Sequence, residues 1–312
     1  MNSLNLKFID CHSHPQDKKF LEEGVDVDYM MSELGEMGGA TIAIGTDYTE
    51  AKKAIEFALK YDNCWATIGI HPADNHAEIF DEEKFEEFLE LGKIDGKNKV
   101  VGIGECGLDY FYFDKILTAK PDFYIETEKV RQKELFINQI EFALKHDLPL
   151  VIHGRPSKNS MDAYRDILEI LEQYDQQKSI SSSLLNPLSG GSDEVRQKNF
   201  SVVPKLKGHA HFFVGNIEIA ERFLKLGFLM SYDGPITFSN EYDNVIKFLP
   251  IENIMIETDS PYAAPMPYRG QLNYPKYVVE VARKIAELKG LSVEEVLEIT
   301  KNNTIKLFNL KN

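Results

Sequence analysis

Short runs of apolar and β-branched residues recur along the 312-residue chain and alternate with longer stretches in which apolar residues return every three or four positions. The short runs lie near 6–11, 40–45, 64–70, 100–106, 149–153, 207–212, 228–232 and 253–258. Stretches with helical spacing between them include 48–60, 81–91, 126–145 and 216–226. This alternation is typical of βα units repeated on a parallel sheet, and eight such units predict an α/β fold of the (β/α)8 barrel type, a TIM barrel.

The chain is longer than the barrel alone requires, because such barrels typically take about 250 residues. Two long insertions, at about 110–126 and 176–205, accommodate most of the excess, and the second is rich in Ser, Gly and Pro, which predicts a loop. After the eighth run, 274–288 and 293–310 predict two closing helices, and Ser292 with Glu295 forms a capping pattern for the second. We therefore expect one domain over 1–312.

Charge and cysteine content narrow the class of protein. Lys and Arg total 35 against 50 Asp and Glu, a net charge of -15, so the overall field does not attract nucleic acid. A phosphate-bearing substrate would have to be held by a few local cations or by metal ions. Cys11, Cys64 and Cys106 lie in separate apolar runs, which indicates reduced thiols. The beginning of the chain lacks a signal-peptide pattern and no run is as long as a membrane span, so we expect a soluble, cytoplasmic protein without a membrane partner.

Candidate metal ligands end the first strand. Side chains alternate between the two faces of a strand, so His12 and His14 point the same way, which in a barrel is inward at the catalytic face. By the same alternation Asp10 would point inward, and Cys11 would point outward to the helices. Two inward imidazoles match the geometry of a metal site.

Similar residues stand at other strand ends. Glu105 lies among glycines at the end of the fourth strand, His153 ends the fifth, His209 and His211 end the sixth, and Asp259 ends the eighth. A glutamate that ends an apolar strand is costly if it has no partner. Because five of eight strand ends offer His, Glu or Asp, packing alone does not explain them, and the pattern predicts a metal centre at the barrel mouth.

These motifs resemble those of the TatD-type metal-dependent deoxyribonucleases, a branch of the amidohydrolase superfamily of (β/α)8 barrels. The resemblance runs almost end to end, and its motifs occur in the family's order. They are Asp-x-His-x-His at 10–14, Gly-Ile-His-Pro at 69–72, Gly-Glu-x-Gly-Leu-Asp at 104–109, Ile-His-x-Arg at 152–155, His-x-Phe-x-Gly at 211–215 and Glu-Thr-Asp-Ser-Pro-Tyr at 257–262.

The resemblance implies two divalent metal ions at the mouth. One would be held by His12, His14, Glu105 and Asp259, and the other by Glu105, His153 and His211, with Glu105 as the bridging ligand. Oxygen and imidazole donors suit Mg, Mn or Zn and do not choose among them. Asp259 is the candidate acceptor of the proton of the attacking water. His71, Arg155 and Arg269 are the candidate substrate contacts.

The chain also departs from the family pattern. Phe212 replaces the usual cysteine after the sixth-strand histidine, and Val214 replaces a Ser or Thr. His209 is an additional histidine on the same face as His211. We expect it to lie deeper in the barrel than a ligand would, the alternative being that it competes for the role of His211.

Three functions remain open from the sequence. The first is a TatD-like deoxyribonuclease that hydrolyses phosphodiesters at single-stranded DNA ends with metal-activated water, so that its partner is DNA or another phosphoester. The second is a two-metal hydrolase of a small lactone, amide or phosphoester. The third is a non-catalytic relative that binds a partner through its long loops. Glu105 stands where many superfamily members have a carboxylated lysine, which favours the nuclease. The sequence leaves open the cleavage polarity, the preference for DNA over RNA and the oligomeric state.

Overall fold

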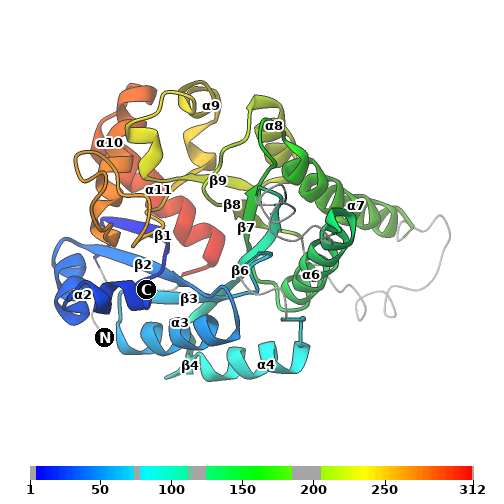
Figure 1. The fold of residues 1–312 in the computed structure, drawn as a ribbon, viewed down its shortest axis with the longest axis horizontal. Helices are drawn as coiled ribbons and strands as arrows, with labels where there is room; N and C mark the ends of the chain where they lie inside the picture. The colour runs from blue at the N-terminus through cyan, green and yellow to red at the C-terminus, as the bar shows by residue number, and fades with distance from the viewer. Residues whose placement is uncertain (1–4, 74–77, 112, 114–123, 185–204, 311–312) are drawn as a thin grey trace, which may run out of the picture.

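Eight parallel strands, hydrogen-bonded in the order β1-β2-β3-β6-β7-β8-β9-β10, form a nearly closed barrel in the computed structural model (Figure 1). The structure describes residues 5–73, 78–111, 113, 124–184 and 205–310. The barrel strands are β1 (Phe8–Ser13), β2 (Gly39–Ile44), β3 (Cys64–Ile68), β6 (Val100–Asp109), β7 (Leu150–Arg155), β8 (Gly208–Ala210), β9 (Leu229–Tyr232) and β10 (Ile254–Ile256). The predicted (β/α)8 architecture is confirmed.

Helices surround the strands on the outside, as their alternation along the chain predicted (Figure 1). They are α1 (Lys18–Glu22), α2 (Val27–Glu36), α3 (Tyr48–Lys60), α4 (Glu82–Leu91), α6 (Ile125–Lys145), α7 (Asp162–Leu184), α8 (Ile217–Leu226), α9 (Asp243–Phe248), α10 (Val278–Lys289) and α11 (Val293–Phe308). Short 3-10 turns η2 (Gly234–Thr237), η3 (Ile251–Asn253) and η4 (Pro275–Tyr277) and a small hairpin of β4 (Lys93–Ile94) and β5 (Lys97–Asn98) complete the described elements. None of the described helices is long and apolar enough to span a membrane.

The seam between the last and first strands closes at the catalytic end. The backbone amide of Asp259 donates to the carbonyl of His12 at 3.0 Å, and that of His14 donates to the carbonyl of Ser260 at 2.7 Å. These bonds continue the barrel beyond the short strand β10, and they bring the β1 end and the loop after β10 into direct contact.

The core has two layers, one between strands and helices and one inside the barrel. Ile9, Val101, Val151 and Met255 fill the interior from different strands, and Phe308 near the end of α11 packs against them. Helix α11 contacts both β1 and β10, and it lies across the barrel in Figure 1. It closes the barrel end opposite the mouth, which confirms the prediction of a closing helix for 293–310. The same prediction for 274–288 is wrong, because α10 is the helix of the eighth βα unit.

One predicted boundary is wrong. The segment 176–205 was expected to be a loop, but α7 continues to Leu184, so its first nine residues are helical. Once α7 has formed, each added residue gains one backbone hydrogen bond without a new nucleation cost, which outweighs the weak preference of serine for helices. The rest of that insertion, 185–204, and most of the first insertion, 112 and 114–123, lie outside the described residues.

Candidate metal centre at the barrel mouth

Two histidines and an aspartate meet where the first and last strands close the barrel. Asp259 Oδ1 lies 3.3 Å from His14 Nε2 and 3.7 Å from His12 Nε2. The Asp10 carboxylate holds the two chain segments together, because it accepts hydrogen bonds from the backbone amide and hydroxyl of Thr258 at 2.9 and 2.6 Å and from the His12 amide at 3.3 Å. The structure thus brings together the first predicted group of ligands.

The Glu105 carboxylate lies at the centre of the mouth and is 5% exposed. Its Oε1 lies 2.8 Å from His153 Nδ1, 2.8 Å from His211 Nε2 and 3.6 Å from His71 Nε2. Its Oε2 lies 3.4 Å from His12 Nε2. Glu105 therefore stands between the donors of the first strand and those of the fifth and sixth, where a bridging ligand would have to be.

Glycines beside Glu105 allow the strands to approach one another closely. A Cβ atom on Gly107, whose φ is +139°, would lie 2.1 Å from the carbonyl oxygen of His153, and one on Gly69 would lie 2.4 Å from the backbone of Gly104. Any larger side chain at these positions would push β3, β6 and β7 apart. These glycines therefore set the distance between Glu105 and the imidazoles.

The charges of the cluster reinforce one another. Burial raises the pKa of Glu105, but the neighbouring rings of His211, His12 and His153 hold it well below its usual range, so the group is ionised. Burial lowers the pKa of His153, but hydrogen bonds from its ring to Asp109 and Glu105 raise it to about 9. Protons on these imidazoles balance the carboxylates, and a divalent metal ion would supply the same positive charge.

The donor set fits divalent metals. At the mouth, three groups of residues each have ligand atoms that lie within 4.8 Å of one another, namely His12–His14–Asp259, His12–Glu105–His211 and His71–Glu105–His153. Within the described residues, both ring nitrogens of the buried His12 lack a hydrogen-bond partner, which is costly unless a ligand satisfies them. Nitrogen and carboxylate donors suit Mg, Mn or Zn. His71, predicted as a substrate contact, lies among these donors.

Two carboxylates that the sequence reasoning did not assign lie behind the imidazoles. Asp109 Oδ2 lies 3.2 Å from His153 Nε2, and Glu257 Oε1 lies 3.3 Å from His211 Nδ1. Burial alone would raise the pKa of Glu257, but the neighbouring His211 outweighs this effect and lowers the pKa to about 2. Such outer carboxylates fix the orientation and tautomer of an imidazole that binds metal. Their signal was present, since both belong to the strand-ending motifs at 104–109 and 257–262.

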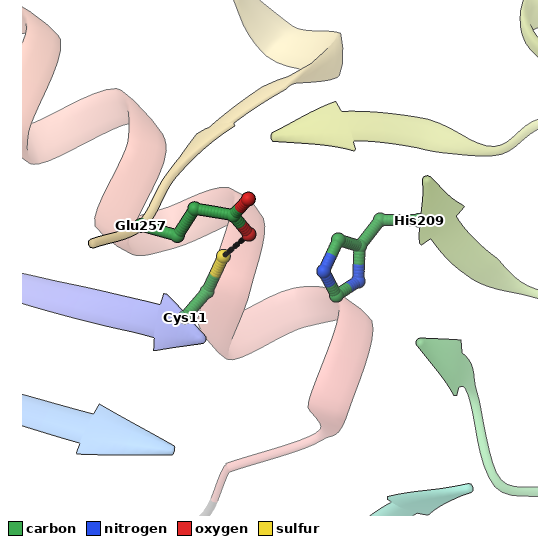
Figure 2. A group of neighbouring side chains, drawn as sticks. All are labelled: Cys11, His209 and Glu257. Atoms are coloured by element: carbon green, nitrogen blue, oxygen red, sulfur yellow. Dashed lines mark hydrogen bonds between the residues drawn. The ribbon is translucent and has the colours of Figure 1, made fainter. Parts of the chain in front are cut away.

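Glu257 also lines the barrel interior beneath the mouth, where Figure 2 shows it with Cys11 and His209. The prediction that Cys11 points outward and Asp10 inward is wrong, because Cys11 packs in the interior core and Asp10 bonds to Thr258. The register between β1 and β2 shifts between Asp10 and Ser13, so strict alternation does not hold there. His209 lies deeper than His211, as expected, with its ring edge-on to Phe308 at 5.8 Å.

The centre forms the floor of an open cavity of about 1280 Å³. The predicted substrate contact Arg155 lines it, with its guanidinium 4.2 Å from the ring centre of Phe111. Lys158 and Arg165, which the sequence did not single out, line the same side. Arg269 does not line this cavity and lies over the ring of Phe238 at 4.1 Å.

A parallel barrel with histidines and carboxylates gathered at the carboxyl ends of its strands is the architecture of a metal-dependent hydrolase, and comparisons identify the family. The model of the family described as TatD related DNase matches residues 9–309. The uncharacterized metal-dependent hydrolase YabD of Bacillus subtilis is 35% identical over 271 residues, which cover 86% of this chain and 87% of YabD. The uncharacterized metal-dependent hydrolase YcfH of Escherichia coli K12 is 29% identical over 302 residues, which cover 96% and 94%.

A solved structure agrees with the fold. The crystal structure of YjjV, a TatD homologue from Escherichia coli K12, matches with a TM-score of 0.73 at 24% identity and covers 98% of this chain and 99% of its own. The chain belongs to the TatD-related DNase family, and it is a metal-dependent hydrolase.

Proposed function

We propose that the protein is a deoxyribonuclease that hydrolyses phosphodiesters at the ends of single-stranded DNA with the help of two divalent metal ions, Mg, Mn or Zn. The observation that carries this proposal is the position of Glu105, a buried carboxylate with histidines on both sides at the floor of an open cavity. A carboxylate shared by two metals is the expected core of such a centre.

We assign the ligands of the two ions as the family resemblance implies. His12, His14, Glu105 and Asp259 would hold one ion, and Glu105, His153 and His211 would hold the other, all of which lie around Glu105 at the mouth. Bound there, the pair would lower the pKa of a water and neutralise charge on the phosphate. Asp259, whose side chain is 19% exposed against 6% for Glu105, faces the cavity and would accept the proton of the attacking water.

The cavity wall supports an anionic polymer as the substrate. Arg155, Lys158 and Arg165 all belong to the stretch from the end of β7 into α7, so positive charge gathers on one side of a cavity in a protein of net charge -15. Arg155 can form paired hydrogen bonds with phosphate oxygens, and His71 lies beside the centre as a second contact. A flexible strand end would enter this cavity, whereas a duplex would meet the acidic outer surface.

The test is hydrolysis of an end-labelled single-stranded DNA oligonucleotide by the purified protein with Mg, with Mn and with EDTA. We expect shortening with metal and none with EDTA. Glu105→Ala removes the shared ligand and should lose metal and more than about 100-fold of the activity, since even outer-carboxylate changes cost about 10–100-fold.

Other outcomes would redirect the proposal. If the oligonucleotide stays intact while metal is bound, a small lactone, amide or phosphoester becomes the better candidate, and screening those compounds follows. Full activity of Glu105→Ala with metal present would show that the bridging assignment is wrong.

A further inference from the structure

A second set of donor atoms lies inside the barrel beneath the mouth. The Cys11 thiol, the His209 ring and the Glu257 carboxylate come from β1, from β8 and from the residue after β10, and all three residues are 0% exposed. One ligand atom of each lies within 4.8 Å of the others. We propose that these three side chains bind a zinc ion, distinct from the ions at the mouth.

The state of His209 provides the first argument. Neither of its ring nitrogens has a hydrogen-bond partner within the described residues, although the side chain is fully buried. His12, a ligand of the proposed centre, shows the same pattern of two unpartnered ring nitrogens. Figure 2 shows the His209 ring facing the Cys11 thiol and the Glu257 carboxylate. A buried polar group without a partner calls for a ligand, an ion or a water.

The chemistry of the donors indicates zinc. A thiolate, an imidazole and a carboxylate are the ligands zinc uses in proteins, whereas Mg and Ca take oxygen ligands. The Cys11 Sγ and Glu257 Oε2 atoms are 3.8 Å apart. Two ligands at usual zinc distances and a tetrahedral angle lie about 3.5 Å apart, so this pair needs little movement, and a His209 nitrogen within 4.8 Å of both atoms would have to move closer. Zinc with one thiolate and one carboxylate is electrically neutral, which favours binding in a fully buried place.

Glu257 can serve both sites at once. Its Oε1 accepts from the Phe212 amide at 2.6 Å and faces His211 Nδ1, while its Oε2 faces Cys11 and accepts from the Ser231 hydroxyl at 2.6 Å. The zinc ion would bind through Oε2 and leave Oε1 with His211. The buried ion would thereby fix the carboxylate that orients a ligand of the mouth.

The experiment is reconstitution of the metal-free protein with cobalt(II) alone, followed by absorption spectroscopy and metal analysis. Cobalt(II) replaces zinc and shows an intense near-ultraviolet charge-transfer band only when a thiolate binds it. The donors at the mouth are nitrogen and oxygen, so the band would report the buried site without reference to activity. We expect the band in the wild-type protein, and one equivalent more of bound cobalt in wild type than in Cys11→Ala.

Variants make the result specific. Cys11→Ala and His209→Leu should each lose the band and one equivalent of metal, with circular dichroism confirming the fold. Cys64→Ala is the matched control, because Cys64 packs between strands and helices and should leave the band unchanged. A wild-type protein without the band, or a band retained in Cys11→Ala, would overturn the proposal. In the first case a buried water is what satisfies His209.

Discussion

Each imidazole that faces Glu105 from the fifth and sixth barrel strands has a carboxylate on its other nitrogen. Asp109 faces His153 Nε2, and Glu257 faces His211 Nδ1. A carboxylate in that position accepts the ring proton and leaves the opposite nitrogen free to bind metal. At the scale of single residues, the centre therefore depends on carboxylates that lie behind the imidazoles.

Glu257→Gln tests this dependence. The amide keeps the shape but can present its NH2 group to His211, which favours the wrong tautomer. We expect metal affinity at the mouth, measured by titration with Mn, to fall about 10–100-fold. Glu241→Gln is the matched control, since Glu241 lines the cavity rim without an imidazole partner in the described contacts. Equal affinities in all three proteins would contradict the positioning role.

At the scale of elements, the stretch from β7 to α7 supplies the positive wall of the cavity. In the double variant Lys158→Ala/Arg165→Ala we expect a higher KM for oligonucleotides and little change with a small phosphodiester, since only a polymer reaches both side chains. Each phosphate contact contributes about 0.7 to the salt slope of single-strand binding, so the slope should fall by about 1.4. Lys145→Ala, on the α6 surface and paired with Glu82 and Glu86, should leave both quantities unchanged. An unchanged slope in the double variant would mean that the strand runs elsewhere.

An ion pair joins α7 to α8 and gives a stability prediction. Arg222 binds Glu172 with two hydrogen bonds at 2.8 and 2.9 Å, and the hydrogen bond from Arg222 holds the pKa of Glu172 below its usual value. The stabilisation is therefore present above the unfolded pKa of about 4.3 and is lost as the pH falls through the lowered folded pKa.

The variant Glu172→Gln should lose about 0.5–1 kcal/mol of unfolding free energy at neutral pH, because the pair is partly exposed. Urea unfolding at neutral and strongly acidic pH checks this, and the gap between the variant and wild type should close in acid. Arg222→Gln should lose a similar amount, and the double variant should lose no more than the sum. A gap that stays constant with pH would assign the effect to packing.

At the scale of the whole molecule, a metal ion bound at the mouth would link strands from opposite sides of the barrel. An ion that binds only the folded protein adds about 2.7 kcal/mol at one hundred times its Kd. Thermal unfolding with Mn at that concentration should therefore occur several degrees higher than with EDTA. Glu105→Ala should show a much smaller difference, since it lacks the shared ligand. Identical midpoints of wild type with and without Mn would argue against a metal centre built from several strands.

Fold and site were predictable to different degrees. Apolar periodicity is a local signal, so the eight strands and their helices could be read from the chain. The ligand candidates could also be read, because parallel strands present their carboxyl ends on one face of a barrel. The orientation of Cys11 could not, since a register shift in β1 breaks the alternation on which it was based. The helical end of α7 was missed because serine content is a weak guide once a helix has begun.

By itself the sequence determined the order of the strands, their closure into a barrel and the residue types at the mouth, because these depend on hydrophobic period and on the ends of individual strands. Only the tertiary structure decided which donors lie together. It placed Glu105 between the histidines, put Asp109 and Glu257 behind them, left Arg269 outside the cavity and set Cys11 beside His209. Such distances join residues far apart in the chain, and they follow from how eight strands tilt and pack around one core.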